Sequence, residues 1–199
     1  MSSDGGRIWQ DKGIVIDYPE SGDGKGASSP SVITVEDEIW VYYHTGTSDF
    51  SMPINWRVKF DLNTFGVIKT GLPERLNIAG FIPRDPNWAF TNLDISYRNS
   101  QFVMLANTSD LKKVVRLISD DGINWRKPVG GQDPILEIPN YFVLTPTAED
   151  ITPNRYKIHF GLGVVSGSNV ESSMIRSREF STSASIPTAT PRTFSFTVN

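Results

Sequence analysis

A turn followed by short strands recurs along this chain at a spacing of about 58 positions. Residues 119–125 read Ser-Asp-Asp-Gly-Ile-Asn-Trp, and residues 2–9 read Ser-Ser-Asp-Gly-Gly-Arg-Ile-Trp. The Asp-Gly pairs of these two segments lie 117 positions apart, which is about two units. A degenerate copy of the turn spans residues 61–68, and residues 177–180 lie about one unit after Gly122. Such self-similarity predicts a repeat protein in which each unit packs on its neighbours.

Between these turns the sequence predicts three hairpins. Residues 31–35 and 39–44 are rich in Val, Ile, Trp and Tyr and are joined by the polar residues 36–38, which is typical of a β-hairpin. Residues 94–106 and 147–161 follow the same pattern. A gapless alignment places Phe102 and then Tyr156 at the position of Trp40, with steps of 62 and 54 positions that again average 58.

The fold class follows from these units. No stretch longer than about 12 residues keeps apolar residues at helical spacing without interruption by Gly or Pro. We therefore expect an all-β chain, and units of four short strands favour a β-propeller, with a β-sandwich as the alternative.

The length limits how many blades the chain can supply. Its 199 residues hold about three and a half units over residues 1–180, followed by a Ser/Thr/Pro-rich linker or tail over 181–199. If a strand at 193–198 shared a blade with the N-terminal strands, the ring would have four blades. Otherwise the chain forms part of a larger ring, such as a five-bladed one, completed by more chain or by self-association.

Composition excludes several classes of partner and chemistry. A net charge of -3 with scattered Lys and Arg argues against nucleic acid. No apolar run approaches the length of a membrane span, and the N-terminus lacks the apolar core of a signal peptide. The absence of Cys excludes disulfides and thiolate chemistry. No cofactor is expected, and the cellular location stays open: extracellular after removal of a signal, or cytoplasmic.

The residues that carry a family resemblance lie in the hairpins and the turn. Residues 29–33 (Ser-Pro-Ser-Val-Ile), residues 40–46 (Trp-Val-Tyr-Tyr-His-Thr-Gly) and the turn at 119–125 resemble the blade pattern of the five-bladed propeller glycosidases of families 43 and 32. The resemblance covers most of residues 1–180 and implies a protein that interacts with glycans. The turn itself identifies a blade rather than catalysis, because its Ser, Asp and Gly suit an edge turn.

Catalysis in the resembled families implies carboxylates at the start of the innermost strands, with the base in an Asp-Pro pair. The corresponding pairs here are Ser29-Pro30, Thr91-Asn92 and Thr145-Pro146, and none contains an acid. A hydroxyl cannot replace a carboxylate as general base at neutral pH. Hydrolysis with the usual two carboxyl groups is therefore not expected from these positions.

Three acids near these pairs are the remaining catalytic candidates, namely Asp94, Glu149 and Asp150. Asp94 has an alternative role, in which it accepts a hydrogen bond from the backbone of a neighbouring blade. Glu149 and Asp150 have the alternative of a solvated hairpin turn.

Candidate glycan contacts come from a loop and from the strand starts. Arg84, Asp85 and Trp88 lie between the first and second units, where a planar Arg fork and an aromatic face suit sugar hydroxyls and rings. The alternative is a surface ion pair with Trp88 packed between blades. Ser29, Thr91 and Thr145 complete this predicted site.

The chain's two histidines are a candidate metal pair. His44 and His159 occupy the second strands of their units, and a strand-end His is more often a hydrogen-bonded residue.

Three functions remain open from the sequence: a glycan-binding propeller without hydrolytic activity, which we favour, an active glycosidase, and a structural or protein-interaction propeller. An oligosaccharide or polysaccharide is the expected partner for the first two.

Overall fold

The computed structural model describes residues 6–11, 13–16, 25–46, 54–64, 68–79, 90–98, 100–108, 111–129, 135–138, 142–152, 155–166 and 169–181. Most of these residues lie in strands, and the one helical element described is the single-turn 3-10 helix η1 (Leu62–Thr64). Within this part of the chain, no helix has the length and apolar character needed to cross a membrane. The expected all-β class is confirmed.

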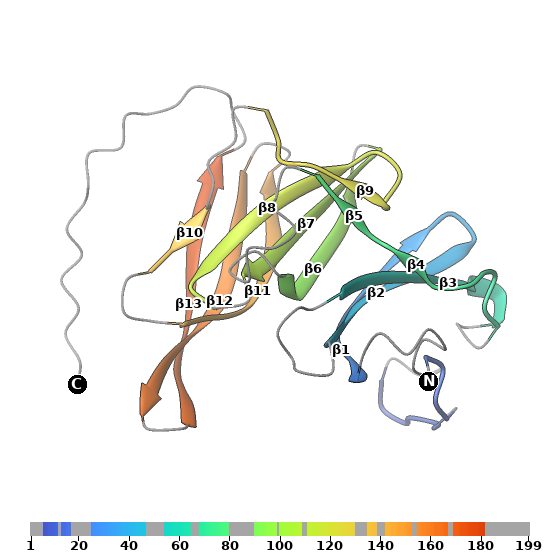
Figure 1. Ribbon diagram of the computed structural model, residues 1–199, viewed down its shortest axis with the longest axis horizontal. Coiled ribbons are helices and arrows are strands. Elements are labelled where there is room, and N and C mark those ends of the chain that lie inside the picture. The colour runs from blue at the N-terminus through green and yellow to red at the C-terminus, as the bar shows by residue number, and fades with distance from the viewer. Residues whose placement is uncertain are drawn as a thin grey trace.

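The strands form three antiparallel sheets and one short parallel pair (Figure 1). The first sheet has the order β1 (Lys25–Val35), β2 (Glu38–Gly46), β3 (Ile54–Asp61), β4 (Glu74–Arg75). The second runs β6 (Phe90–Arg98), β7 (Gln101–Thr108), β8 (Lys113–Ser119), β10 (Leu136–Glu137). The third contains β11 (Phe142–Thr152), β12 (Arg155–Ser166) and β13 (Asn169–Ser181). The parallel pair joins β5 (Asn77–Ile78) to β9 (Asn124–Trp125) and so ties the end of the first sheet to the second.

The three sheets are arranged as blades of a propeller. Each is a meander, and the first strands of the sheets are neighbours, because β1 contacts β6 and β6 contacts β11. In the described residues the sheets do not close into a ring, so this part of the chain is an incomplete propeller. Residues 6–11 and 13–16, the described part of the N-terminal copy, contain no strand.

Strands in the middle sheet are apolar on both faces because each face meets another sheet. Along β7, Phe102 and Met104 pack in the cluster that joins the first and second sheets, whereas Leu105 packs in the cluster shared with the third. Alternate side chains of a strand point to opposite faces. This position between two sheets explains why residues 102–106 read as a continuous apolar run rather than an alternating one.

The turn at residues 119–125 locks the second sheet to the first. Within the turn, the Ser119 hydroxyl accepts the Gly122 amide and the Asp121 carboxylate accepts the amides of Ile123 and Asn124. Desolvation is the largest single influence on the pKa of the Asp121 carboxyl and raises it. The hydrogen bonds donated to the carboxylate outweigh it together and hold this pKa well below its usual range.

Two buried residues of the first sheet donate hydrogen bonds to backbone carbonyl groups of this turn. The Tyr42 hydroxyl donates to the Gly122 carbonyl at 3.2 Å, and Arg57 Nη1 donates to the Asp121 carbonyl at 2.8 Å. Arg57 also lies 4.2 Å from the Trp40 ring centroid and forms an ion pair with Glu74 at 2.7 Å. The buried Arg57 guanidinium thus interacts with a carbonyl, an aromatic ring and a carboxylate. A buried charge needs such partners to offset the loss of its hydration.

The N-terminal copy of this turn repeats its internal contact. Trp9 Nε1 donates to the Gly6 carbonyl at 2.9 Å, as Trp125 Nε1 donates to the Gly122 carbonyl at 3.2 Å. Gly6 and Gly122 both have positive φ, at 89° and 73°. The equivalent glycines are therefore 116 positions apart, two units of 58, and the Asp-Gly alignment at 117 is wrong by one residue. Trp9 is 72% exposed whereas Trp125 is 1% exposed, because only the second turn packs on a described sheet.

The hairpin alignment is also wrong by one residue. β2 begins at Glu38 and β7 at Gln101, so the residue equivalent to Trp40 is Val103 rather than Phe102. Trp40 and Phe102 instead face each other across the first two sheets, with stacked rings 5.1 Å apart. A one-residue shift moves a strand side chain to the other face of the sheet, which is why the two aromatics meet rather than superimpose.

We predict that Gly122→Ala strongly destabilises the protein. An added Cβ would lie 2.5 Å from Tyr42 Oη and 2.8 Å from Trp40 Cζ3, at a φ of +73°. Left-handed strain and overpacking together should lower the free energy of unfolding by about 2–5 kcal/mol. Denaturant unfolding measures the loss, with Gly71→Ala as the matched control, because a Cβ at Gly71 meets no atom within 4 Å. Equal stability of the two variants would contradict the proposed importance of the turn.

Candidate functional site

The first strand of each sheet is interrupted near its start by the same irregularity. The register shifts between Ser28 and Ser31 in β1, between Thr91 and Asp94 in β6, and between Leu144 and Thr147 in β11. At each shift one residue that is not glycine takes positive φ: Ser29 (50°), Asn92 (47°) and Thr145 (42°). These three residues are therefore equivalent, at steps of 63 and 53 positions that average 58.

This equivalence corrects one of the three aligned pairs. The second pair is Asn92-Leu93 rather than Thr91-Asn92, because Asn92 carries the positive φ. The corrected set is Ser29-Pro30, Asn92-Leu93 and Thr145-Pro146. None of these pairs contains a carboxylate.

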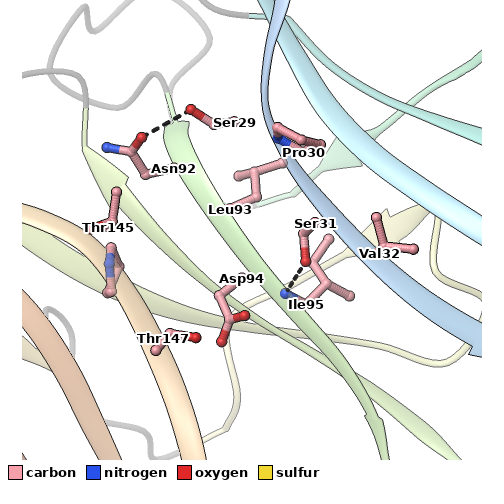
Figure 2. A pocket seen from close by; sticks show the side chains of 11 residues that line it. Ser29, Pro30, Ser31, Val32, Asn92, Leu93, Asp94, Ile95, Thr145 and Thr147 are labelled. Carbon is pink, nitrogen blue, oxygen red and sulfur yellow. Dashed lines mark hydrogen bonds between the residues drawn. The ribbon is translucent and has the colours of Figure 1, made fainter. Parts of the chain in front are cut away.

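The three strand starts border one pocket of about 370 Å³ (Figure 2). Eleven residues line it, three or four from each strand: Ser29, Pro30, Ser31, Val32, Asn92, Leu93, Asp94, Ile95, Thr145, Pro146 and Thr147. Hydroxyl, amide and carboxyl groups alternate with apolar side chains around this wall. Such a mixture is typical of small-molecule sites, where a few polar groups fix orientation and apolar groups supply contact area.

A repeated set of hydrogen bonds connects the strands behind this wall. The Ser31 hydroxyl accepts the Ile95 amide at 2.8 Å, and the Asp94 carboxylate accepts the Ala148 amide at 2.8 Å. Both acceptors, Ser31 and Asp94, lie two positions after the positive-φ residue of their own strand. Both donors, Ile95 and Ala148, lie three positions after the positive-φ residue of the next sheet's first strand. Ser29 Oγ donates a further bond of 3.0 Å to Asn92 Oδ1. The pocket wall is thus held by the same contact at both junctions between sheets.

Asp94 is the one ionisable residue among those that line the pocket. Burial raises the pKa of its carboxyl above the usual value, and the hydrogen bonds from the Ala148 amide and the Thr147 hydroxyl offset only part of that rise. Figure 2 shows the carboxyl between β6 and the Thr147 side chain. The contact with a neighbouring sheet's backbone, raised from the sequence as an alternative for Asp94, is present.

The other two acids are placed differently. Glu149 does not line the pocket; it lies exposed on β11, 2.8 Å from His159 Nε2. This hydrogen bond with His159 lowers the pKa of the Glu149 carboxyl. Asp150 pairs with Tyr156 through the backbone of β11 and β12, and its side chain lies outside the described part of the structure.

The two histidines have separate partners in separate sheets. His44 Nε2 lies 2.8 Å from the Ser28 hydroxyl in the first sheet, and burial lowers the pKa of its ring. His159 contacts Glu149 in the third. Within the described residues, no three His, Asp or Glu side chains gather in a way that could hold a metal ion.

The predicted glycan contacts divide into three groups. Ser29 and Thr145 line the pocket as expected. Thr91 lies beside it, with a buried hydroxyl that has no hydrogen-bond partner among the described residues, while its neighbour Asn92 takes the lining position. Arg84, Asp85 and Trp88 lie outside the described residues. Three polar residues that line the pocket are not among the predicted contacts: Ser31, Asn92 and Thr147. Asn92 was named in the second pair, and the tolerance of Asn for positive φ was the signal that favours it over Thr91.

Comparison with known proteins identifies the fold. No protein-family model matches the sequence, and no curated protein matches it significantly. Among solved structures, an α-L-arabinofuranosidase from Lactobacillus brevis matches with a TM-score of 0.55, 10% identity and coverage of 76% of this chain and 52% of the other. An α-L-arabinofuranosidase from Podospora anserina, solved with cellotriose, matches with a TM-score of 0.55 and 10% identity, over 83% of this chain and 49% of the other. A family 117 glycoside hydrolase from Zobellia galactanivorans matches with a TM-score of 0.50 and 16% identity, over 79% of this chain and 58% of the other.

These matches show that the chain has the fold of β-propeller glycosidases. The chain spans about half the length of these structures, from 49% to 58%.

We predict that Asp94 makes stability fall as pH rises from about 4. Its folded-state pKa is above the reference value of 3.8, so between the two values the folded protein binds the proton more tightly than the unfolded chain. The free energy of unfolding therefore decreases as pH rises from the unfolded pKa through the folded pKa. Asp94→Asn should remove this part of the pH dependence. Thermal unfolding of both proteins from pH 3.5 to 7 tests it, and parallel profiles would contradict the prediction.

Proposed function

We propose that the pocket at the starts of β1, β6 and β11 binds a carbohydrate without hydrolysing it. One observation carries the proposal: equivalent polar residues of three successive sheets, Ser29, Asn92 and Thr145, converge on a single pocket. The glycosidase fold of the chain is consistent with a sugar in that position, although fold alone does not determine function.

The chemistry of the wall suits a sugar ring. Sugar hydroxyls donate and accept hydrogen bonds, and the wall offers the Asn92 amide, the Thr145 and Thr147 hydroxyls and the Asp94 carboxyl. The C–H faces of a ring can pack on Pro30 or Pro146, which also line the pocket. A volume of about 370 Å³ lies at the lower end of the range for small-molecule sites.

The absence of hydrolysis is proposed from the carboxyl groups. Glycosidases usually need two carboxyl groups across the scissile bond, one as acid and one as base or nucleophile. The residues that line the pocket contain one, Asp94, which is already bonded to the Ala148 amide. Glu149 points its carboxylate to His159 instead.

A glycosidase is the second candidate, and the raised pKa of Asp94 favours it. A buried carboxyl that stays protonated at higher pH is suited to act as a general acid. A second carboxyl would then come from residues outside the described part of the chain, and the long segment with Arg84 and Asp85 is where we would look first.

We predict that Asn92→Gly weakens oligosaccharide binding about two- to tenfold, because a hydrogen bond of about 0.5–1.5 kcal/mol is lost. Glycine keeps the positive φ of 47° at this position. Calorimetric titration with arabinan, xylan, fructan and galactan oligosaccharides measures the affinity. Asn63→Gly, in the exposed residue of η1, is the matched control and should bind as the unmodified chain does. Unchanged affinity in Asn92→Gly would remove the pocket from the proposal.

We predict that the purified chain releases no product from these four oligosaccharide classes. Mass spectrometry of the incubated mixtures detects any cleavage. Defined products that disappear in Asp94→Asn would establish the glycosidase instead and assign Asp94 a role in it. Trp88→Ala supplies a further comparison: loss of glycan binding in a folded variant assigns Trp88 to the sugar site, and no binding in either protein favours an assembly role.

A further inference from the structure

The pocket has one charged group in its wall, and no described group of opposite charge lines it. Among the described residues of this wall, Asp94 is the one acid, and none is Lys, Arg or His. Arg98, four positions further along β6, lowers the pKa of the Asp94 carboxyl through its charge, but it does not line the pocket. Its effect on this pKa is smaller than that of burial or of the hydrogen bonds from Ala148 and Thr147. When Asp94 is ionised, the described wall therefore presents a negative charge to a bound molecule.

The contact between the sheets does not require that charge. Ser31, Asp94 and Thr147 are equivalent, because each lies two positions after the positive-φ residue of its strand. The Ser31 hydroxyl accepts the Ile95 amide at 2.8 Å, the same distance at which the Asp94 carboxylate accepts the Ala148 amide. A neutral hydroxyl thus suffices for this contact, whereas burying a carboxylate costs hydration. The structural contact therefore does not explain why this one position of the three carries a charge.

The Asp94 carboxylate has acceptor capacity for a ligand. An ionised carboxylate offers about four lone-pair positions. Its described donors, the Ala148 amide on Oδ2 and the Thr147 hydroxyl, occupy only part of them. Figure 2 shows this carboxyl between β6 and β11, at the wall of the pocket.

An ammonium group is the donor that suits this carboxylate best. A hydrogen bond between two ions is stronger than one between neutral groups. The ammonium also supplies the opposite charge that a desolvated carboxylate needs. A carboxylate on the ligand would be repelled instead, because the two like charges would share a partly desolvated site.

We propose that Asp94 makes the pocket select sugars that carry a protonated amine over neutral sugars, and neutral sugars over sugars that carry a carboxylate. The inference rests on the proposed function, because it concerns the same pocket. Asn92, Thr145 and the two proline rings would contact the sugar ring whatever its charge, and Asp94 would bind the ammonium group. Asp94 is then a specificity-determining residue of the sugar site as well as a contact between two sheets.

Four β-linked trisaccharides of the same ring test this order: those of glucosamine, N-acetylglucosamine, glucose and glucuronate. Acetylation keeps the nitrogen of the amine and removes its charge. Calorimetric titration at pH 6, where the amine is protonated and the uronate is ionised, measures the affinities. We expect the glucosamine trisaccharide to bind about tenfold tighter than the acetylated and glucose forms, and the glucuronate form to bind about tenfold weaker than glucose.

Asp94→Asn removes the charge and keeps a side-chain oxygen for the Ala148 amide. In this variant the glucosamine and glucose trisaccharides should bind with affinities within about twofold of each other. Asp120→Asn is the matched control, because it removes the same charge from an exposed residue that pairs with Arg126 and does not line the pocket. It should keep the full preference, and thermal unfolding checks that both variants are folded.

The outcomes separate this inference from the proposed function. Equal binding of the glucosamine and glucose trisaccharides, or a preference that survives in Asp94→Asn, would overturn the inference alone. Binding of only the arabinan, xylan, fructan or galactan oligosaccharides would also overturn it and leave the proposed function standing. No binding of any of these sugars would overturn both.

A measurement on the unmodified chain keeps the test decisive if Asp94→Asn does not fold. The preference for the glucosamine trisaccharide should shrink as the NaCl concentration rises, because salt screens the attraction between the two charges. A preference that does not change with salt would contradict selection by the Asp94 charge.

Discussion

The contact between the Asp121-Gly122 turn and the first sheet fixes how the sheets lie against each other. Tyr42 and Arg57 are buried and donate to the carbonyls of this turn, and neither could be buried without such acceptors. The turn in turn needs a glycine, because any Cβ would enter the space of Tyr42 and Trp40. Packing, hydrogen bonding and backbone conformation therefore all constrain this one turn, and Trp40, which lies against Gly122, also stacks on Phe102 of the second sheet.

The pocket is a consequence of the same repetition, at the other end of the strands. Each first strand contains a bulge with a positive-φ residue, and at both junctions an acceptor two positions later binds the next sheet's backbone. In the first sheet the acceptor is the Ser31 hydroxyl, and in the second it is the Asp94 carboxylate. The contact that joins the sheets thus also places Asp94 in the pocket, where burial raises the pKa of its carboxyl. Structural and chemical roles are combined in one side chain, which is why Asp94→Asn affects the pH dependence of folding as well as any chemistry.

The sequence predicts the hairpins of the repeating unit correctly, but it aligns the first hairpin on the second with an error of one residue. The hairpins at 31–44 and 94–106 are recognisable because β-branched and aromatic residues surround a short polar turn. The alignment of Trp40 with Phe102 failed because both are large aromatics, whereas the register of a strand is set by the face it presents. Thr91 was chosen in place of Asn92 because the position of the bulge in β6 depends on how β6 pairs with β7, and the tolerance of Asn for positive φ is the one sequence signal that favours Asn92.

The sequence by itself determined the all-β class, the repeat period and the absence of an acid from the equivalent strand starts, because these depend on residue type and spacing along the chain. Only the tertiary structure decided which residues meet. Ser31, Asn92 and Thr147 share a wall, whereas Glu149, two positions after Thr147, turns to His159. The physical reason is that strand pairing and sheet packing, not position along one strand, bring side chains together: Thr147 lies beside the bulge that borders the pocket, and Glu149, two positions further along β11, lies within reach of His159 on β12.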